Sequence, residues 1–246
     1  MYDDTYAVED RHWWFRNLRR ILAQSIGRHA GTSRPLTILD AGCGTGRNLI
    51  FYREYGWAVG LDKSPVGLYY CRQRNLNELA RGDVTSLPFR PHSFDVVNSS
   101  DVLYALEPPA GMRLLTESYR VLKPGGLLFL NTAAMEILYS DHDRAVMSKK
   151  RYGKSELVAI VEQAGFELVH ARYWNSILFL PVVAHRVGRK IINKGREDAR
   201  GDLRPQNEML SGILYLLMRL DWALAGALPF GTSLFCVARK PAATKS

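Results

Sequence analysis

The sequence lacks several features that mark whole classes of protein. Its three cysteines lie far apart without CxxC spacing, which argues against a disulfide framework and a structural zinc site. It has no internal repeat and no low-complexity tract, and its first fifteen residues, acidic and then aromatic, do not resemble a signal peptide. The apolar stretch LSGILYLLMRLDWALAGALP carries Arg219 and Asp221 at its middle, so it is too polar to span a bilayer. These absences predict a cytoplasmic protein without a metal ion.

Positive charge is concentrated in the C-terminal part of the chain. Residues 1–140 contain 16 Lys and Arg against 14 Asp and Glu, whereas residues 141–246 contain 17 against 10. The excess lies in runs such as KKRYGK (149–154) and RVGRKIINKGR (186–196). It indicates an anionic partner, which is a phosphorylated substrate, a membrane surface or nucleic acid, or else a solvated basic face. The oligomeric state stays open.

Short apolar segments alternate with helical patterns along most of the chain. An amphipathic helix is predicted over 11–30, with Trp14, Leu18, Ile21, Leu22 and Ile26 at helical spacing. Strands are predicted at 36–42, 57–64, 79–83, 94–100, 127–132, 166–174 and 232–240. Helices are predicted at 46–56, 64–75, 111–123 and 154–165. The alternation predicts a parallel α/β sheet with helices on both faces.

Residues 175–231 interrupt this alternation. The segment is far longer than the usual connection of about 2–6 residues between elements of an α/β domain. It contains the apolar patch SILFLPVVAH, a basic stretch, the loop GDLRPQN and a second apolar stretch. We expect two amphipathic helices that form a lid over a substrate site, dock on a membrane or pack against the sheet edge.

The stretch LDAGCGTGRN, residues 39–48, combines a glycine-rich turn with a preceding acid. Its glycines follow the spacing Gly42-x-Gly44-x-Gly46, and Arg47 stands where the dinucleotide fingerprint GxGxxG has its third glycine. Asp40 would repel a pyrophosphate at this turn, which disfavours a nicotinamide or flavin cofactor. No GK[ST] follows, so the turn is not a P-loop.

A cationic ligand fits the same turn better. S-adenosylmethionine (SAM) carries a sulfonium and an ammonium but no phosphate, so Asp40 would attract it while the glycines allow close backbone approach. Asp62 lies 22 residues after Asp40, a spacing suited to a carboxylate that accepts from ribose hydroxyls. Asp83 offers a third carboxylate, for the adenine amino group. All three acids lie at the carboxyl ends of predicted strands, where open α/β sheets bind ligands.

The ordered motifs ILDAGCGTGRN, GLDKSP, ARGDVTSLPF, FDVVNSSDVL and RVLKPGGLLFLNT resemble those of class I SAM-dependent methyltransferases. The resemblance covers residues 36–174, and TSLFCVARK is similar to the family's last strand. It implies a single Rossmann-like domain over 1–246 with a seven-stranded sheet in the order 3-2-1-4-5-7-6. Strand 7 would be antiparallel, and 175–231 would form a helical insertion between strands 6 and 7.

The resemblance also implies roles for residues of this sequence. Asp40, Gly42 and Gly44 would hold the methionine part of SAM, Asp62 the ribose, and Asp83 and Val84 the adenine. Ser99 would line the methyl end. The remaining positions expected to contact the cofactor, through these motifs and the N-terminal helix, are Tyr6, Trp14, Arg16, Ala41, Cys43, Asn48 and Lys63.

Two segments resemble a subgroup of bacterial methyltransferases that act on small molecules and glycans. EDRHWWFRNLRR (9–20) is similar to a helix that folds over the cofactor, so residues 9–30 are expected to cover it, with Arg16 or Arg19 paired to the SAM carboxylate. YSDHDRAVMSKKRYGKSEL (139–157) is similar to a segment with a histidine where Ser148 stands here. Candidates for a general base are therefore His12, Tyr104, His142 and Asp143.

The chemistry predicted is methyl transfer from SAM, with S-adenosylhomocysteine as the product. The first hypothesis is O-methylation of a sugar, a lipid-linked glycan or a secondary metabolite, and N-methylation of an amino sugar or small amine is the second. An RNA methyltransferase is an alternative supported only by the basic C-terminal part, and a non-catalytic SAM-binding protein is another. Peripheral contact with the inner face of a membrane is a further hypothesis, suggested by SILFLPVVAHRVGRK.

Overall fold

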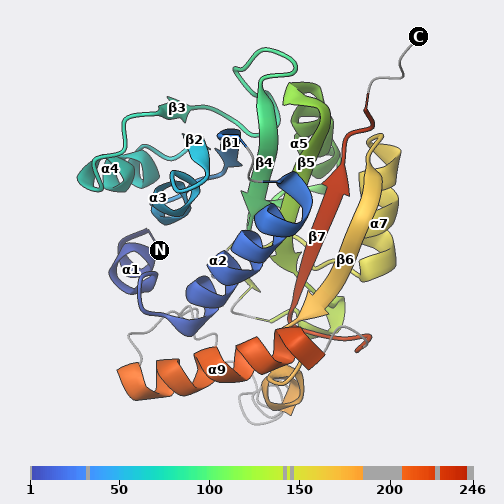
Figure 1. Ribbon diagram of the computed structural model, residues 1–246. Helices are drawn as coiled ribbons and strands as arrows, with labels where there is room; N and C mark the ends of the chain where they lie inside the picture. Colours follow the sequence, from blue (N-terminus) through green and yellow to red (C-terminus); the bar gives the residue numbers. More distant parts are fainter. Residues whose placement is uncertain are drawn as a thin grey trace.

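A computed structural model describes residues 2–31, 34–140, 143–144, 147–184, 207–224 and 228–242. Seven strands form one sheet in the order β3-β2-β1-β4-β5-β7-β6 (Figure 1). β7 pairs antiparallel with both β5 and β6, and the other pairs are parallel. The predicted strand order and the antiparallel last strand are therefore confirmed. The strands are β1 (Leu36–Ala41), β2 (Gly56–Asp62), β3 (Leu79–Arg81), β4 (Phe94–Ser100), β5 (Leu122–Ala133), β6 (Glu167–Trp174) and β7 (Ser233–Arg239).

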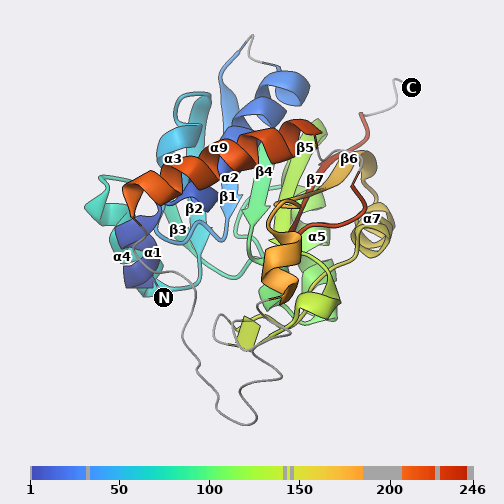
Figure 2. The ribbon, with the colours of Figure 1, turned by 90° about the horizontal axis from the view of Figure 1, so that it is seen from below.

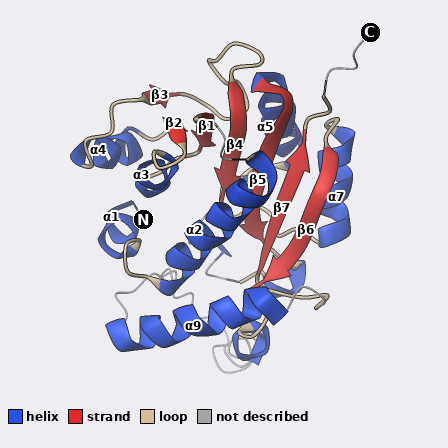
Figure 3. Ribbon diagram, viewed as in Figure 1, coloured by secondary structure: helices blue, strands red, loops and turns tan. Residues whose placement is uncertain are grey.

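Helices cover both faces of the sheet because the central strands are apolar on both sides (Figure 3). They are α1 (Tyr2–Val8), α2 (Trp13–Ser25), η1 (Ile26–Ala30), α3 (Arg47–Tyr52), α4 (Pro65–Gln73), η2 (Leu103–Ala105), α5 (Pro108–Val121), η3 (Glu136–Leu138), α7 (Lys154–Gln163) and α9 (Glu208–Leu224). One buried apolar cluster joins α2, α3 and α4 to Ile38 of β1 and Val96 of β4. The other joins α5 and α7 to Leu39 and Val97, the next residues of the same two strands. Successive strand residues thus pack on opposite layers.

Local signals position several of these elements. Ser64 accepts a hydrogen bond from the Gly67 N–H at the start of α4, and Pro65 occupies the first turn. His12 caps α2 by accepting from the Trp14 N–H at 3.3 Å. Gly165, after α7, has a φ of +93°, which a residue with a side chain rarely adopts.

The predicted N-terminal helix differs from the one observed. Residues 9–30 do not form a single helix: α2 begins at Trp13, its last turn is the π-helical η1, and a separate helix, α1, precedes it. The residues between α1 and α2 form a hydrogen-bonded turn, in which the Arg11 and His12 N–H groups donate to the Val8 carbonyl. β5 also begins earlier than predicted, since Lys123-Pro-Gly-Gly continues the strand.

The carboxyl ends of β4, β5 and β6 point toward one edge of the sheet, and α9 lies across that edge (Figure 1). α9 also packs along α2. Among the described residues, no helix is both long enough and apolar enough to cross a membrane. The predicted segment 175–231 thus contributes α9 and a short helical turn at 179–184, while residues 185–206 and 225–227 lie outside the described residues.

Candidate functional site

The glycine turn after β1 requires glycine at two places for different reasons. Gly42, Gly44 and Gly46 all have positive φ, at +89°, +54° and +80°. A Cβ on Gly42 would lie 2.2 Å from Val102 Cγ2, whereas a Cβ on Gly44 would meet nothing closer than Tyr2, at 3.9 Å. Gly42 therefore lets the turn pack against the segment after β4, and Gly44 leaves the backbone open to a ligand.

Asp40 lies behind this turn on β1 and is almost completely buried. Its Oδ1 accepts a hydrogen bond from Asn98 Nδ2 at 2.7 Å, and Ser100 Oγ donates to Asn98 Oδ1 at 3.0 Å. Its Oδ2 is buried without a hydrogen-bond partner in the described part of the chain. Burial raises the pKa of Asp40 to about 7. A cationic group placed at Oδ2 would supply the partner that this carboxylate lacks.

Asp62, at the end of β2, connects the second strand to the glycine turn. Its Oδ2 accepts from the Gly44 N–H and its Oδ1 from the Ser64 N–H, both at 2.8 Å. The Tyr2 hydroxyl of α1 lies 3.4 Å from Oδ1. Two backbone N–H groups thus hold the carboxylate in place, and the Tyr2 hydroxyl is a third donor beside it.

Asp83 follows β3 and is exposed. Its Oδ1 accepts from the Thr85 N–H at 2.9 Å and from Thr85 Oγ1 at 2.7 Å. These hydrogen bonds lower the pKa of Asp83, so it is a carboxylate at neutral pH. Val84 beside it is buried, so an apolar side chain lies next to this hydrogen-bond acceptor, and the adenine contact of the two residues stays a prediction.

α1 and the residues after it fasten onto the glycine turn. Glu9 is buried and accepts from Thr45 Oγ1 at 2.5 Å and from Arg74 at 2.7 Å. The Arg74 guanidinium lies 4.4 Å from the centre of the Tyr6 ring, and Tyr6 stacks on Tyr70 with centroids 4.5 Å apart. Tyr6 is thus held between α1 and α4, beside the crevice that it is predicted to line.

The comparisons with known proteins agree with this geometry. A family model described as a methyltransferase domain matches residues 39–130. The bifunctional biotin biosynthesis protein BioHC of Teredinibacter turnerae is 31% identical over 222 residues, covering 78% of this chain and 38% of that protein. The malonyl-[acyl-carrier protein] O-methyltransferase of Serratia marcescens is 38% identical over 108 residues, covering 42% of this chain and 41% of that protein. The chain belongs to the class I SAM-dependent methyltransferases.

Solved methyltransferase structures share the fold. The putative methyltransferase of Haloferax volcanii, solved in complex with the Trm112 activator, superposes with a TM-score of 0.63 at 19% identity and covers 98% of both chains. A putative methyltransferase of Bacillus halodurans gives 0.60 at 18% identity, covering 91% of this chain and 98% of that one. This methyltransferase spans about half the length of the curated relatives it matches.

A further acid, Asp101, directly follows the end of β4. Asp101 has a φ of +61°, a strained conformation for a residue with a side chain. Asn131 Nδ2 donates to its Oδ1 at 3.0 Å, and Trp174 Nε1 donates to Asn131 Oδ1 at 2.9 Å. The centroids of the Trp174 and Trp14 rings lie 5.5 Å apart, so α2 packs against one of the residues that position Asp101. Burial raises the pKa of Asp101 to about 7.

Sequence reasoning missed the positioning role of Asn131 and Trp174. A polar residue in the otherwise apolar strand LLFLNT was the available signal for Asn131. Nothing local to the sequence indicated that Trp174, about forty residues later, would donate to it. Ser99, which sequence reasoning did select, is fully buried, and its hydroxyl donates to the Ala41 carbonyl at 3.1 Å.

The other predicted residues fall into two groups. Trp14 and Arg16 turn toward the core and toward α9, where the Arg16 guanidinium lies 4.2 Å from the centre of the Tyr215 ring. Arg19 donates to the Glu9 carbonyl at 2.8 Å. The structure thus gives Arg16 and Arg19 protein partners, and their pairing with a SAM carboxylate stays a prediction. Around the turn, Cys43 is buried, Asn48 is partly buried and Lys63 is exposed.

The candidate bases lie in different surroundings. His12 is buried, its Nδ1 caps α2, and burial lowers its pKa. Burial and the nearby charge of Asp101 raise the pKa of Tyr104, so its hydroxyl stays protonated. Asp143 is buried against Arg151, with Nε to Oδ1 at 2.7 Å, and also accepts from the Ser140 N–H. His142 lies outside the described residues.

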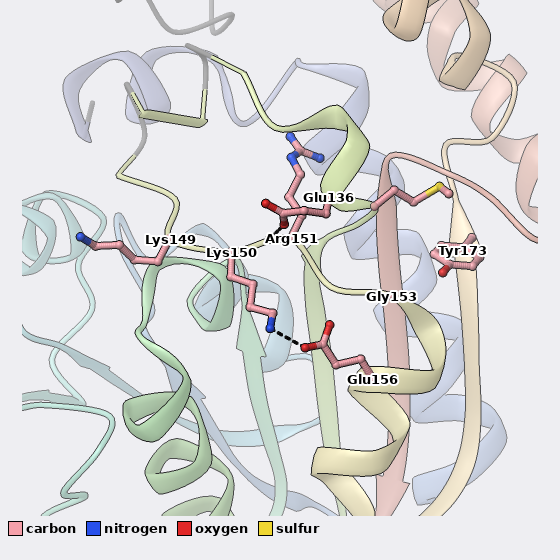
Figure 4. Close-up of a pocket in the computed structure, with 8 residues that line it drawn as sticks. Glu136, Lys149, Lys150, Arg151, Gly153, Glu156 and Tyr173 are labelled. Atoms are coloured by element: carbon pink, nitrogen blue, oxygen red, sulfur yellow. Dashed lines mark hydrogen bonds and ion pairs between the residues drawn. The ribbon is translucent and has the colours of Figure 1, made fainter.

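A pocket of about 460 Å³ opens next to this region (Figure 4). It is lined by Met135, Glu136, Lys149, Lys150, Arg151, Gly153, Glu156 and Tyr173. The backbone N–H groups of Lys149 and Lys150 donate to the Tyr104 carbonyl, which joins the pocket wall to the segment after β4. Lys150 pairs with Glu156 at 2.5 Å across the pocket. Within the described part of the chain, no three His, Cys, Asp or Glu side chains gather as metal ligands would.

Proposed function

We propose that this protein transfers the methyl group of SAM to a hydroxyl group of a small molecule, such as a sugar, a lipid-linked glycan or a secondary metabolite. N-methylation of an amino sugar or small amine is the alternative within the same chemistry. The observation that carries the proposal is the buried Oδ2 of Asp40, which has no partner in the described chain, behind an open glycine turn.

Three carboxylates would hold the cofactor. Asp40 would balance the cationic methionine end, Asp62 would accept from the ribose hydroxyls after Tyr2 gives way, and Asp83 would accept from the adenine amino group. When bound, SAM supplies a methyl group that is already activated by its sulfonium. The protein therefore mainly aligns the acceptor and excludes water, for which α1 and α2 are well placed.

Asp101 and Tyr104 would handle the proton of the acceptor. With its pKa at about 7, the Asp101 carboxyl is partly ionised at neutral pH and can accept a proton from a hydroxyl or ammonium group. Tyr104, whose raised pKa keeps its hydroxyl protonated, would donate a hydrogen bond to the acceptor. Among the four candidates from the sequence, Tyr104 is the one we retain, because His12 and Asp143 are committed to a helix cap and an ion pair.

The pocket beside Tyr104 supports a small, polar acceptor. Its volume lies within the range of about 300–1,000 Å³ usual for small-molecule sites. Lys149 and Lys150 favour an acceptor with an anionic group, which would replace their ion pairs with Glu107 and Glu156. The malonyl-[acyl-carrier protein] O-methyltransferases among the relatives are named for an acidic acceptor.

Calorimetry with SAM, S-adenosylhomocysteine and NAD tests the cofactor. We expect both SAM and its product to bind and NAD not to bind, and binding of NAD alone would refute the proposal. Transfer of a radiolabelled methyl group to a panel of hydroxyl and amino acceptors then identifies the atom that is methylated. SAM binding without transfer to any acceptor would favour the non-catalytic alternative.

An RNA acceptor is the second candidate function. It rests on the basic excess of residues 141–246 and on a relative named as a tRNA N(3)-methylcytidine methyltransferase, from Drosophila melanogaster, at 28% identity over 163 residues. It requires an affinity for RNA that falls steeply with salt concentration. Failure of the protein to be retained on immobilised tRNA at low salt would dispose of this candidate.

The place of action follows as a separate proposal. A lipid-linked acceptor would require the enzyme to work at the inner face of a membrane, as a peripheral protein. α9 and the turn at 179–184 are the described elements with the exposed apolar surface for such a contact.

A further inference from the structure

α9 has two faces, and the inner one is fully occupied by the protein. Asp221 is buried and accepts from the N–H groups of Asn175, Ser176 and Ile177, each at 2.8 Å. Ser211 Oγ donates to the Arg11 carbonyl at 2.8 Å. These contacts fix the rotation of α9 about its own axis, so the direction of its outer face is set by the fold.

The outer face of α9 is apolar and exposed. Four side chains at positions i, i+4, i+7 and i+11 form what we call the α9 stripe: Met209, Ile213, Leu216 and Leu220, with exposed fractions of 71%, 49%, 57% and 54%. Such spacing places them on one side of a helix. Exposed apolar side chains that gather on one face of a helix offer a contact surface to a partner.

A second apolar element lies beside the α9 stripe. The residues that follow Ser176 are ILFLPVVA (177–184), and Leu180 among them is 68% exposed. Asp221 joins this turn to α9 through its hydrogen bond to the Ile177 N–H. Seen from below, in Figure 2, α9 and this turn both lie on the side of the molecule that faces the viewer. The apolar surface is therefore formed by two elements on one side of the protein.

The charge of the sequence indicates the nature of the partner. Residues 185–206 connect the turn to α9 and contain seven Lys or Arg against three Asp or Glu. In the chain, this basic segment directly follows Ala184, the last residue of the turn, and directly precedes Asn207, the residue before α9. Aliphatic side chains next to basic residues in the sequence match a lipid surface that carries anionic headgroups.

A second copy of the chain fits this surface less well. Eleven residues of helix span about 17 Å, so the α9 stripe offers roughly 170 Å² if its apolar strip is about 10 Å wide. A stable protein interface buries about 800 Å² on each partner. A helix that lies in a bilayer interface needs no such complementary area, because it is surrounded by lipid.

We propose that the α9 stripe and the turn at 177–184 dock this protein on an anionic lipid surface. The docked side includes α9, which crosses the edge of the sheet where β4, β5 and β6 end, so this edge would face the lipid (Figures 1 and 2). This docking proposal rests on the proposed function in one respect only, namely that the acceptor would be lipid-linked. The docking itself requires no turnover.

Sedimentation with vesicles tests the docking. The full chain is mixed with vesicles of phosphatidylcholine alone or with a fifth of phosphatidylserine. We expect binding to the anionic vesicles that weakens at 0.5 M NaCl, because the charges act across water. Leu216→Glu should weaken this binding at least about tenfold, since it places a charge on the outer face of α9 that would enter the lipid.

The matched control is Trp57→Glu, which puts the same charge on a residue that is 59% exposed on β2, near the opposite edge of the sheet. It should bind vesicles like the wild type. Leu220→Gln provides a second stripe variant, and calorimetry with SAM on every variant shows whether the cofactor site is intact. SAM binding that fails in all variants counts against the proposed function and not against the docking.

Three outcomes would overturn the docking. The wild type does not sediment with anionic vesicles; Leu216→Glu and Trp57→Glu bind equally well; or light scattering shows a wild-type dimer that Leu216→Glu dissociates, in which case a second copy covers the α9 stripe.

Discussion

The unpartnered carboxylate of Asp40 predicts that SAM affinity depends on pH. In the free protein the pKa of Asp40 is raised to about 7 by burial. A cation at Oδ2 favours the ionised carboxylate and lowers this pKa, so binding must release a proton wherever Asp40 is protonated beforehand. Affinity should therefore fall as the pH drops below 7.

The size of the effect follows from the fraction of ionised Asp40. With a pKa of about 7, roughly half of the molecules are ionised at pH 7 and about 3% at pH 5.5. If SAM binds only to the ionised form, its affinity should fall about 15-fold over this interval. Release should rise from about half a proton per bound SAM at pH 7 to nearly one at pH 5.5.

Titration calorimetry measures both quantities, because the apparent enthalpy varies with the ionisation enthalpy of the buffer in proportion to the protons released. The interval from pH 5.5 to 7.0 is chosen because the ammonium of SAM stays protonated throughout it. Asp40→Asn is the control: it should bind SAM at least about tenfold more weakly at pH 7 and lose most of the pH dependence. Equal pH dependence in wild type and Asp40→Asn would refute the assignment of the proton to Asp40.

The remaining predictions concern stability and the cofactor site. In the folded protein the pKa of Asp40 exceeds its ordinary 3.8, so the folded state binds more protons than the unfolded state. The free energy of unfolding should therefore fall as the pH rises from about 4 to about 7, by at most about 4 kcal/mol. Urea titrations should show a flatter profile for Asp40→Asn. Asp62→Ala should weaken SAM binding by at least about 30-fold while the protein stays folded. The substitution removes the predicted acceptor for the ribose hydroxyls and leaves the Gly44 N–H without its hydrogen-bond acceptor. An unchanged affinity for SAM would count against the ribose role. Gly42→Ala should lower the free energy of unfolding by about 2–4 kcal/mol. Adding Val102→Ala should restore only the part due to the steric clash, because the φ of +89° at residue 42 remains. Full recovery of the melting temperature in the double variant would mean that backbone strain is negligible. Arg151→Met should cost about 3–5 kcal/mol by leaving Asp143 buried without its guanidinium, and a melting temperature within a degree of wild type would contradict this.

The sequence predicted the cofactor side of the site because its signals are local. The glycines of the turn, which have positive φ, lie within ten residues of Asp40, and each of the three acids lies at the end of a short apolar segment. Parallel strands then bring Asp40, Asp62 and Asp83 to one edge whatever the details of packing. Their approximate placement needs only the strand order.

The acceptor side could not be predicted in the same way. Asp101, Asn131 and Trp174 are joined by hydrogen bonds across three segments, and each bond depends on the register of β4, β5 and β6. His12 and Asp143 are chemically suitable as bases, and only their partners in the fold show that one caps a helix and the other pairs with Arg151. The type of a residue shows which reactions its side chain can support, but its hydrogen-bond and ion-pair partners in the folded protein determine whether it is available for them.

The family and the strand order could be predicted because the ordered motifs resemble those of known methyltransferases, and the preference for a cationic cofactor because glycine conformation and charge are local properties. The contact of Arg16 with Tyr215, the approach of the Tyr2 hydroxyl to Asp62 and the exposure of the α9 stripe became visible only in the folded chain. These three features depend on the rotation of α1, α2 and α9 about their own axes in the folded protein. The rotation of a helix is set by the contacts it makes with segments far away in the chain, which no local pattern records.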